Sequence, residues 1–167
     1  SSRLLLRTTQ NTPIGALSII SREHILLAAG FTSIEALVDG LSSTDQSLEI
    51  KKVNNIPIIS DLIDDYFDGD LQAIDGIKVD QPGEKFSQAA WKSMRKIAPG
   101  KTLSYADLAK RSGSPDAVRA AGSACARNLI ALVVPCHRVV KTGGALGNYA
   151  YGLKYKEWLL RHEGALQ

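Results

Sequence analysis

The chain changes character at Gln81-Pro82-Gly83, where a turn-forming tripeptide coincides with a reversal of charge. Residues 1–80 hold 6 Lys/Arg and 12 Asp/Glu, a net charge of −6, whereas residues 81–167 hold 14 Lys/Arg and 5 Asp/Glu, a net charge of +9. Pro and Gly interrupt regular secondary structure. The tripeptide therefore predicts a boundary between a domain over residues 1–80 and a domain over residues 84–167. The basic half suits a polyanionic partner, although charge alone fits a solvated basic face equally well.

The composition is that of a globular protein, with 44% hydrophobic and 22% charged residues among 167. This balance excludes a disordered chain. No apolar run approaches the ~18 residues of a membrane span, and the first apolar stretch, at residues 4–6, is too short for a signal peptide. Two cysteines cannot form a disulfide scaffold. We therefore expect no membrane contact and a reducing compartment: the cytoplasm, or the nucleus in a eukaryote.

The apolar pattern of the first half predicts both strands and helices. Two apolar stretches flank Arg22-Glu23-His24, which is typical of a β-hairpin. Elsewhere apolar residues recur either at the spacing of one helix face or near period two. The expected elements are a hairpin over residues 12–20 and 25–31, helices over 34–41 and 57–69, and an edge strand over 71–79. Residues 42–55 are polar and show no clear pattern.

The second half predicts a series of short helices. The first spans residues 86–94 and ends before Pro99-Gly100. Ser104 and Asp107 have the spacing of a capping box, which predicts a helix that starts there and stops at Gly113. Ser114-Pro115-Asp116 predicts the start of another helix with Ser114 as its cap. Two short helices joined by a tight turn are similar to a helix-turn-helix, although such pairs also occur in proteins that bind no DNA.

One face of that last helix is nearly bare. Arg119, Gly122, Ser123 and Ala126 share this face, and Arg119 is its single large side chain. A protein that reads bases in the major groove normally presents several Arg, Asn or Gln side chains. A smooth face instead suits close approach to a narrow groove with little sequence preference. Close helix packing inside a core is the alternative interpretation.

The residues that carry chemistry follow Leu132-Val133-Val134, which we expect to form a buried strand. They are Pro135-Cys136-His137-Arg138, followed by a glycine-rich loop through Gly147-Asn148-Tyr149. Cationic neighbours favour the thiolate form of a cysteine. Neighbouring residues in an extended chain point opposite ways, so adjacency does not establish a relay between Cys136 and His137. A buried thiol beside a surface histidine remains the alternative.

These motifs together resemble the O6-alkylguanine-DNA alkyltransferases, a family of direct-reversal DNA repair proteins. The segment Val134-Pro135-Cys136-His137-Arg138-Val139 is similar to the family's active-site motif. Further similar segments occur in family order at Phe86 to Trp91 and at residues 99–105, 118–121, 127–128, 147–149 and 156–164. The resemblance covers residues 84–164, while Pro13-Ile14-Gly15 and Tyr66-Phe67 match the family's first domain only weakly.

The resemblance implies a ribonuclease-H-like α/β first domain and a mostly helical second domain with a winged helix-turn-helix. It implies that the O6-alkyl group of guanine is transferred to Cys136 after the nucleotide is flipped out of the duplex. Each molecule would react once, because nothing regenerates the cysteine. Whether the O4-alkyl group of thymine is also accepted stays open. The implied partner is double-stranded DNA with O6-alkylguanine, bound through the minor groove by a monomer, without a cofactor.

The resemblance also assigns roles to individual residues. Glu163 would orient His137, which acts through water on the Cys136 thiol, while Asn128 holds the adjacent turn and Tyr105 helps to flip the base and supplies a proton. Arg119 would fill the gap left by the flipped base, with Ser114 and Thr142 also at the DNA. The implied substrate pocket comprises Cys125, Val139, Tyr149, Ala150 and Tyr151. Plain structural roles remain alternatives: a core Tyr105, a solvated Arg119, a helix-capping Asn128 and a surface Glu163.

Two positions depart from the family pattern. Cys125 stands where some relatives have a bulkier pocket residue, and we interpret it as a buried small hydrophobe. Tyr151 replaces a Gly that commonly follows the pocket tyrosine, which predicts a tighter pocket and weaker repair of benzyl than of methyl adducts. The first domain also lacks the zinc-binding Cys/His cluster of some relatives. Its single candidate ligand is His24, so we expect no metal there.

Three other functions compete with alkyl transfer. A sensor that flips alkylguanine without reacting would lack the reactive cysteine, and Cys136 argues against it. A metal module using Cys125, Cys136, His137 and His162 fits no standard zinc spacing. A cysteine hydrolase would turn over many times, whereas an alkyltransferase stops after one equivalent.

Overall fold

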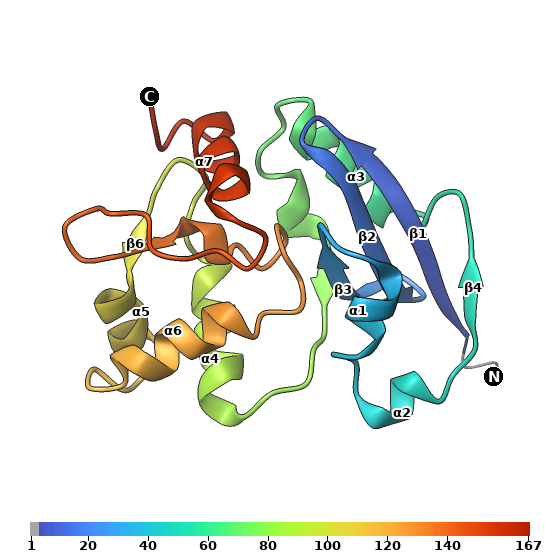
Figure 1. Ribbon diagram of the computed structural model, residues 1–167, viewed down its shortest axis with the longest axis horizontal. Coiled ribbons are helices and arrows are strands. Elements are labelled where there is room, and N and C mark those ends of the chain that lie inside the picture. The colour runs from blue at the N-terminus through green and yellow to red at the C-terminus, as the bar shows by residue number, and fades with distance from the viewer. Residues whose placement is uncertain (1–3) are drawn as a thin grey trace. The chain divides into compact units, whose positions relative to one another are not determined.

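The computed structural model describes residues 4–167, which divide into two compact units (Figure 1). The first unit ends at Pro82 but also includes Leu129–Val133, and the second holds Gly83–Asn128 and Val134–Gln167. The sequence boundary placed all of residues 84–167 in one domain. Backbone hydrogen bonds explain the difference, because Ala29 N–H donates to Leu129 O (3.0 Å) and Ala131 N–H donates to Ala29 O (2.8 Å).

The first unit is built on a sheet with the strand order β4-β1-β2-β3-β5. β1 (Leu5–Thr12), β2 (Gly15–Arg22) and β3 (Ile25–Gly30) pair antiparallel in succession. β4 (Ile50–Lys52) joins β1 in parallel, and β5 (Lys78–Val79) joins β3 in parallel. The predicted hairpin is confirmed as β2–β3, and Glu23 in its turn takes a positive φ of 55°.

Helices cover this sheet at the predicted places. α1 (Ile34–Val38) begins at the N-cap Ser33, and α3 (Ile59–Phe67) buries one apolar face that includes Ile63 and Tyr66. The core beneath α1 contains a buried cluster of apolar side chains: Leu5, Ile20, Leu27, Ala28, Leu37 and Leu41. Full burial of each large apolar side chain contributes about 1.5–3 kcal/mol relative to leaving it in water, so this cluster is what fixes the register of the sheet.

Three parts of the first unit differ from the sequence prediction. β1 was not expected, because its exposed side carries polar residues and only part of it alternates. Residues 42–55 form α2 (Ser43–Gln46) and β4, both too short to leave a periodic pattern. The strand expected over residues 71–79 is mostly wrong. It contains the 3₁₀ helix η1 (Ala73–Gly76), and only the two residues of β5 pair at the sheet edge.

The second unit is mostly helical. It contains α4 (Lys85–Met94), α5 (Tyr105–Arg111), α6 (Val118–Ala126) and α7 (Leu153–His162). A short parallel pair joins β6 (Leu103–Ser104) to β7 (Val139–Val140). α5 and α6 lie beside each other in Figure 1, and the Trp91 indole on α4 donates to Ala124 O on α6 at 2.9 Å. Among residues 4–167, no helix has the length and apolar character needed to span a bilayer.

Two local predictions for residues 84–167 are wrong. Ser114 does not cap the next helix, because residues 114–117 form a turn closed by Ala117 N–H on Ser114 O at 2.9 Å. α6 begins only at Val118, and its N-cap residue makes no side-chain cap bond. Residues 132–134 are buried as expected but are not a strand. Leu132 has a positive φ of 71°, which breaks the extended conformation.

The two serines allow a direct test of helix capping. Ser104 Oγ accepts from Asp107 N–H at 3.0 Å at the start of α5. We predict that Ser104→Ala lowers the free energy of unfolding by about 1 kcal/mol. Ser114→Ala is the matched control and should change it by less than about 0.5 kcal/mol, as expected for a surface substitution. Urea denaturation measures both, and equal losses would contradict this assignment of the cap.

Candidate active site

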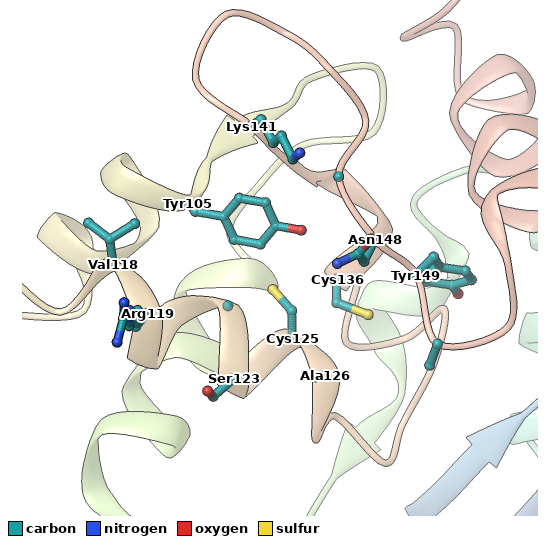
Figure 2. Close-up of a pocket in the computed structure, with 13 residues that line it drawn as sticks. Tyr105, Val118, Arg119, Ser123, Cys125, Ala126, Cys136, Lys141, Asn148 and Tyr149 are labelled. Carbon is teal, nitrogen blue, oxygen red and sulfur yellow. The ribbon is translucent and has the colours of Figure 1, made fainter.

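A cavity of about 580 Å³ opens in the second unit beside Cys136 (Figure 2). Six of the residues predicted from the sequence line it: Tyr105, Arg119, Cys125, Cys136, Tyr149 and Ala150. The cavity lies between α6 and the loop that follows β7. Its size is within the range typical of small-molecule sites.

Cys136 lies in the 3₁₀ helix η2 (Cys136–Arg138), just after Pro135, with 8% of its surface exposed. Asn128 holds this turn from the end of α6. Its Nδ2 group donates to Val134 O at 2.9 Å and approaches Cys136 Sγ at 3.4 Å. The backbone of Asn128 also bonds to Cys125 O. Asn128 therefore connects the helix that carries Cys125 to the turn that carries Cys136, which agrees with the position predicted for it.

Behind the cavity wall, His137, Arg138 and Glu163 form a buried cluster. His137 Nε2 lies 2.8 Å from Glu163 Oε2, so the predicted contact between these residues is present and Glu163 is not a surface residue. Arg138 donates to both carboxylate oxygens, from Nε to Oε1 and from Nη2 to Oε2, each at 2.9 Å. Its Nη1 donates to Ile97 O at 2.7 Å. The sequence analysis did not assign Arg138 to this cluster.

The protonation of this cluster follows from burial and charge. Burial alone would raise the pKa of the Glu163 carboxyl, but the charges and hydrogen bonds of His137 and Arg138 outweigh it and hold that pKa well below its usual range. Burial lowers the pKa of His137, and Arg138 and Lys156 add to this, while Glu163 acts against it. The lowered pKa favours the neutral form of the His137 imidazole. A carboxylate only accepts hydrogen bonds, so Nε2 carries the proton.

Cys136 differs from the sequence expectation. Burial raises the pKa of its thiol, and the Asn128 hydrogen bond and the charge of Lys156 lower it without compensating. His137 and Arg138, which were expected to favour the thiolate, are not among the groups that lower the pKa of this thiol, and the Arg138 guanidinium bonds to Glu163. The sulfur therefore keeps its proton until a base removes it.

Lys156 is a site residue that the sequence analysis did not identify. It is fully buried on α7, and its Nζ donates to Val139 O at 2.7 Å and to Asn148 O at 3.1 Å. These contacts join β7 to the loop over the cavity. The available signal was its position on the helix face that carries Leu159 and Leu160, because a lysine on an apolar face needs a buried partner.

The remaining predicted residues lie outside the cavity lining. Val139 is completely buried, and its carbonyl is taken by Lys156. Tyr151 packs edge-on against Tyr149, with ring centroids 5.7 Å apart, and burial raises the pKa of Tyr151 to about 12. Ser114 and Thr142 are not among the lining residues. Seven lining residues were not among the predicted site residues: Val118, Gly122, Ser123, Ala126, Lys141, Gly147 and Asn148.

Tyr105 and Gly147 meet across the mouth of the cavity. Gly147 has a φ of +76°, and a Cβ at this position would lie 2.8 Å from the Tyr105 hydroxyl oxygen. Figure 2 shows the Tyr105 ring pointing into the cavity from α5. Burial raises the pKa of Tyr105, with the charges of Cys125 and Cys136 adding to it and a backbone hydrogen bond from Asn148 opposing it. A glycine is thus required for the loop to approach this hydroxyl.

Residues 4–167 contain no group of three or more His, Cys, Asp or Glu side chains arranged to hold a metal ion. Cys125, Cys136, His137 and His162 are therefore not gathered into a metal centre.

Known proteins share this architecture and these segments. A family model described as the DNA binding domain of 6-O-methylguanine DNA methyltransferase matches residues 85–165. The methylated-DNA–protein-cysteine methyltransferase of Salmonella typhimurium is 37% identical over 167 residues, covering 97% of each chain. The chain belongs to the methylated-DNA–protein-cysteine methyltransferase family. A human member is 48% identical over 77 residues, covering 46% of this chain and 37% of the human one.

Solved structures of the family extend the match to both domains. The O6-methylguanine methyltransferase of Mycobacterium tuberculosis superposes with a TM-score of 0.76 at 28% identity, covering 98% of this chain and 94% of that one. A structure of the same organism's protein in complex with DNA gives a TM-score of 0.78 at 28% identity, covering 96% and 93%. These matches confirm the predicted α/β first domain and mostly helical second domain of this methyltransferase family member.

Gly147 provides a test of the cavity geometry. We predict that Gly147→Ala slows single-turnover methyl transfer to the protein, because the new methyl group displaces the Tyr105 ring. Gly144→Ala is the matched control, since Gly144 also has a positive φ (+97°) but has nothing within 4 Å of its Cβ position. Both should lose about 1–2 kcal/mol of stability from backbone strain. Equal transfer rates in the two variants would show that Tyr105 does not need this approach.

Proposed function

We propose that the protein repairs DNA by transferring the O6-alkyl group of guanine to Cys136 in a single turnover. One observation carries the proposal: the Cys136 sulfur, which Asn128 contacts, lies on the cavity wall, and the next residue is a buried histidine that bonds to Glu163. The family to which the chain belongs is named for methyl transfer from DNA to a protein cysteine. The volume of the cavity suits a base as the substrate. The buried cluster of His137, Arg138 and Glu163 suits removal of the proton from the Cys136 thiol.

The reaction transfers one proton and one alkyl group. His137 Nδ1 receives the thiol proton through one water, because Nε2 already donates to Glu163 and Nδ1 has no hydrogen-bond partner among residues 4–167. The sulfur then forms a bond to the alkyl carbon as the bond from that carbon to guanine O6 breaks. Tyr105 donates a proton towards the departing base and is reprotonated from His137. The proton thus ends on guanine, and the thioether on Cys136 has no leaving path.

The base must leave the duplex to reach this sulfur, because the cavity is inside the second unit. We propose that Arg119, on the cavity rim, occupies the space the base leaves in the stack. α6 can approach a minor groove closely, since nothing lies within 4 Å of a Cβ built on Gly122. The bare face offers few groups that read base edges, so binding has little sequence preference. The structure of the Mycobacterium tuberculosis relative in complex with DNA supports DNA binding by this family member.

Charge supports a phosphate-binding surface around the same rim. Lys141 is exposed, lines the cavity and lies next to Thr142 in the loop after β7. We place Lys141, Thr142 and Ser114 at the phosphates that flank the flipped nucleotide. Ser114 lies in the turn between α5 and α6. The protein acts as a monomer on double-stranded DNA, in the cytoplasm or nucleus, and needs no cofactor for this chemistry.

The identity of the acceptor can be tested by mass. After one round with excess duplex containing O6-methylguanine, the wild-type protein should gain about 14 Da at Cys136, the increment of covalent methyl capture. Cys136→Ser should gain nothing. Cys125→Ser is the matched control, because Cys125 lines the same cavity, and it should still react once. A gain on Cys125, multiple turnover, or binding without any gain would contradict the proposal and favour the hydrolase or sensor alternatives.

The departure at Tyr151 predicts a preference for small adducts. Tyr151 supports the Tyr149 ring from behind, so Tyr151→Gly should loosen the pocket wall. We predict that single-turnover repair of O6-benzylguanine becomes faster relative to O6-methylguanine. The expected gain is about 10-fold or more, the effect of giving a substrate room for one more methylene group in a pocket. The measurement compares both lesions in both proteins. An unchanged benzyl-to-methyl ratio would show that Tyr151 does not limit pocket size.

A further inference from the structure

We infer that Arg138 is a positioning residue for alkyl transfer: it holds the Glu163 carboxylate so that His137 rests as a neutral imidazole with Nδ1 open to accept the thiol proton. The inference rests on the proposed roles of Cys136 and His137. It assigns a different role to Arg138 from the one that sequence adjacency suggests, because this residue acts on the carboxylate and not on the sulfur.

The position of Glu163 explains why the carboxylate needs a cation. Glu163 is the C-cap of α7, and Gly164 follows it with a φ of +80°. Gly164 N–H donates to Arg161 O at 3.0 Å and Ala165 N–H donates to Leu160 O at 2.8 Å, which together form a Schellman motif. This motif fixes Glu163 at the negative end of the helix dipole, where a carboxylate is disfavoured. Its side chain is also withdrawn from solvent, with no accessible surface.

Arg138 supplies the cation that the buried Glu163 carboxylate needs. Its Nε and Nη2 groups bond to the two oxygens of Glu163 in the bidentate geometry that suits guanidinium and carboxylate. Its Nη1 bonds to Ile97 O in the segment after α4. That segment reaches Gly100, where a Cβ would lie 3.0 Å from the Glu163 carbonyl oxygen. The Pro99-Gly100 turn therefore lies against the same carboxylate-bearing residue and limits its movement.

The charge balance of the cluster then decides the state of His137. With one guanidinium, one carboxylate and a neutral imidazole, the buried cluster has no net charge. A second proton on His137 would leave a net positive charge where all three side chains are at most 1% exposed. Uncompensated buried charge is costly. Lys156 and the Cys136 thiol are the other titratable groups that act on this part of the site, and the Lys156 charge further disfavours the imidazolium.

This arrangement gives His137 a defined function. Nδ1 is completely buried and has no hydrogen-bond partner in the part of the chain that the structure describes, so it is available to accept a proton. When it takes the thiol proton, the positive charge forms next to Glu163, which stabilises it through the existing 2.8 Å contact. Arg138 prevents that charge from forming at rest and Glu163 supports it during transfer.

Titration of His137 tests the inference without DNA. The Cε1–H resonance is followed by NMR from pH 4 to 10, a range chosen to span about two units or more around the ordinary histidine pKa. We predict that Arg138→Met raises the His137 titration midpoint by about one pH unit or more, because the carboxylate then faces the imidazole without a compensating cation. The acidic limb of the pH–rate profile for Cys136 methylation should move in the same direction. Arg161→Met is the matched control and should leave the midpoint unchanged, since Arg161 is exposed and its side chain bonds to Gln167 O.

A second substitution separates electrostatics from disruption. In Arg138→Met combined with Glu163→Gln, neither buried charge remains, so the His137 midpoint should fall again. Loss of packing alone would not reverse the shift. Arg138→Lys, which keeps the charge but loses the bidentate geometry, should give an intermediate midpoint and remains usable if Arg138→Met fails to fold.

Two results would overturn the inference: a folded Arg138→Met with an unchanged midpoint, or a double variant whose midpoint stays raised. If Arg138→Met does not fold, an unchanged midpoint in a folded Arg138→Lys overturns it equally. Failure of the proposed function would appear separately, as a wild-type protein that gains no mass from methylated DNA.

Discussion

The structure of the site depends on one buried carboxylate. Glu163 accepts from His137 and twice from Arg138, and these three bonds connect the end of α7 to the turn that carries Cys136. A carboxylate in this position is stable only if every lone pair that leaves water finds a donor. The same bonds also set the tautomer of the imidazole. The bonds of Glu163 therefore stabilise the fold of the site and also prepare His137 to act on the Cys136 thiol.

Other polar groups of the second unit hold the elements around Cys136 in place. The capped start of α5 directs Tyr105 towards the cavity, and Asn128 holds the acceptor turn at the end of α6. Lys156 connects β7 to the glycine-rich loop. Each of these polar groups is satisfied by backbone or side-chain partners, which is what permits a reactive thiol to be withdrawn from solvent. The thiol is thus protected from incidental reaction and depends on His137 to be activated when a substrate fills the cavity.

Much of the helical framework could be predicted from the sequence because its signals are local. Apolar spacing located α3 and α4, and the Ser104 capping box located α5. The start of α6 was misplaced because Ser114-Pro115-Asp116 has the composition of a helix start but closes a turn instead. Likewise the β-branched run before Pro135 looks like a strand, yet Leu132 adopts a positive φ and residues 129–133 pack with the first unit. The local amino-acid pattern does not show that residues 129–133 contact the first unit, because these contacts join segments far apart in the sequence.

The sequence by itself determined which chemical groups are present and which family they belong to, because a Cys-His-Arg segment, a helix with a bare face and a distant Glu occur in a fixed order. Only the tertiary structure decided which charge acts on which group. Arg138 follows Cys136 closely in the chain, but its guanidinium reaches Glu163, 25 residues further along. Electrostatic energy depends on distance and burial in space, and one turn of 3₁₀ helix is enough to send neighbouring side chains to different partners.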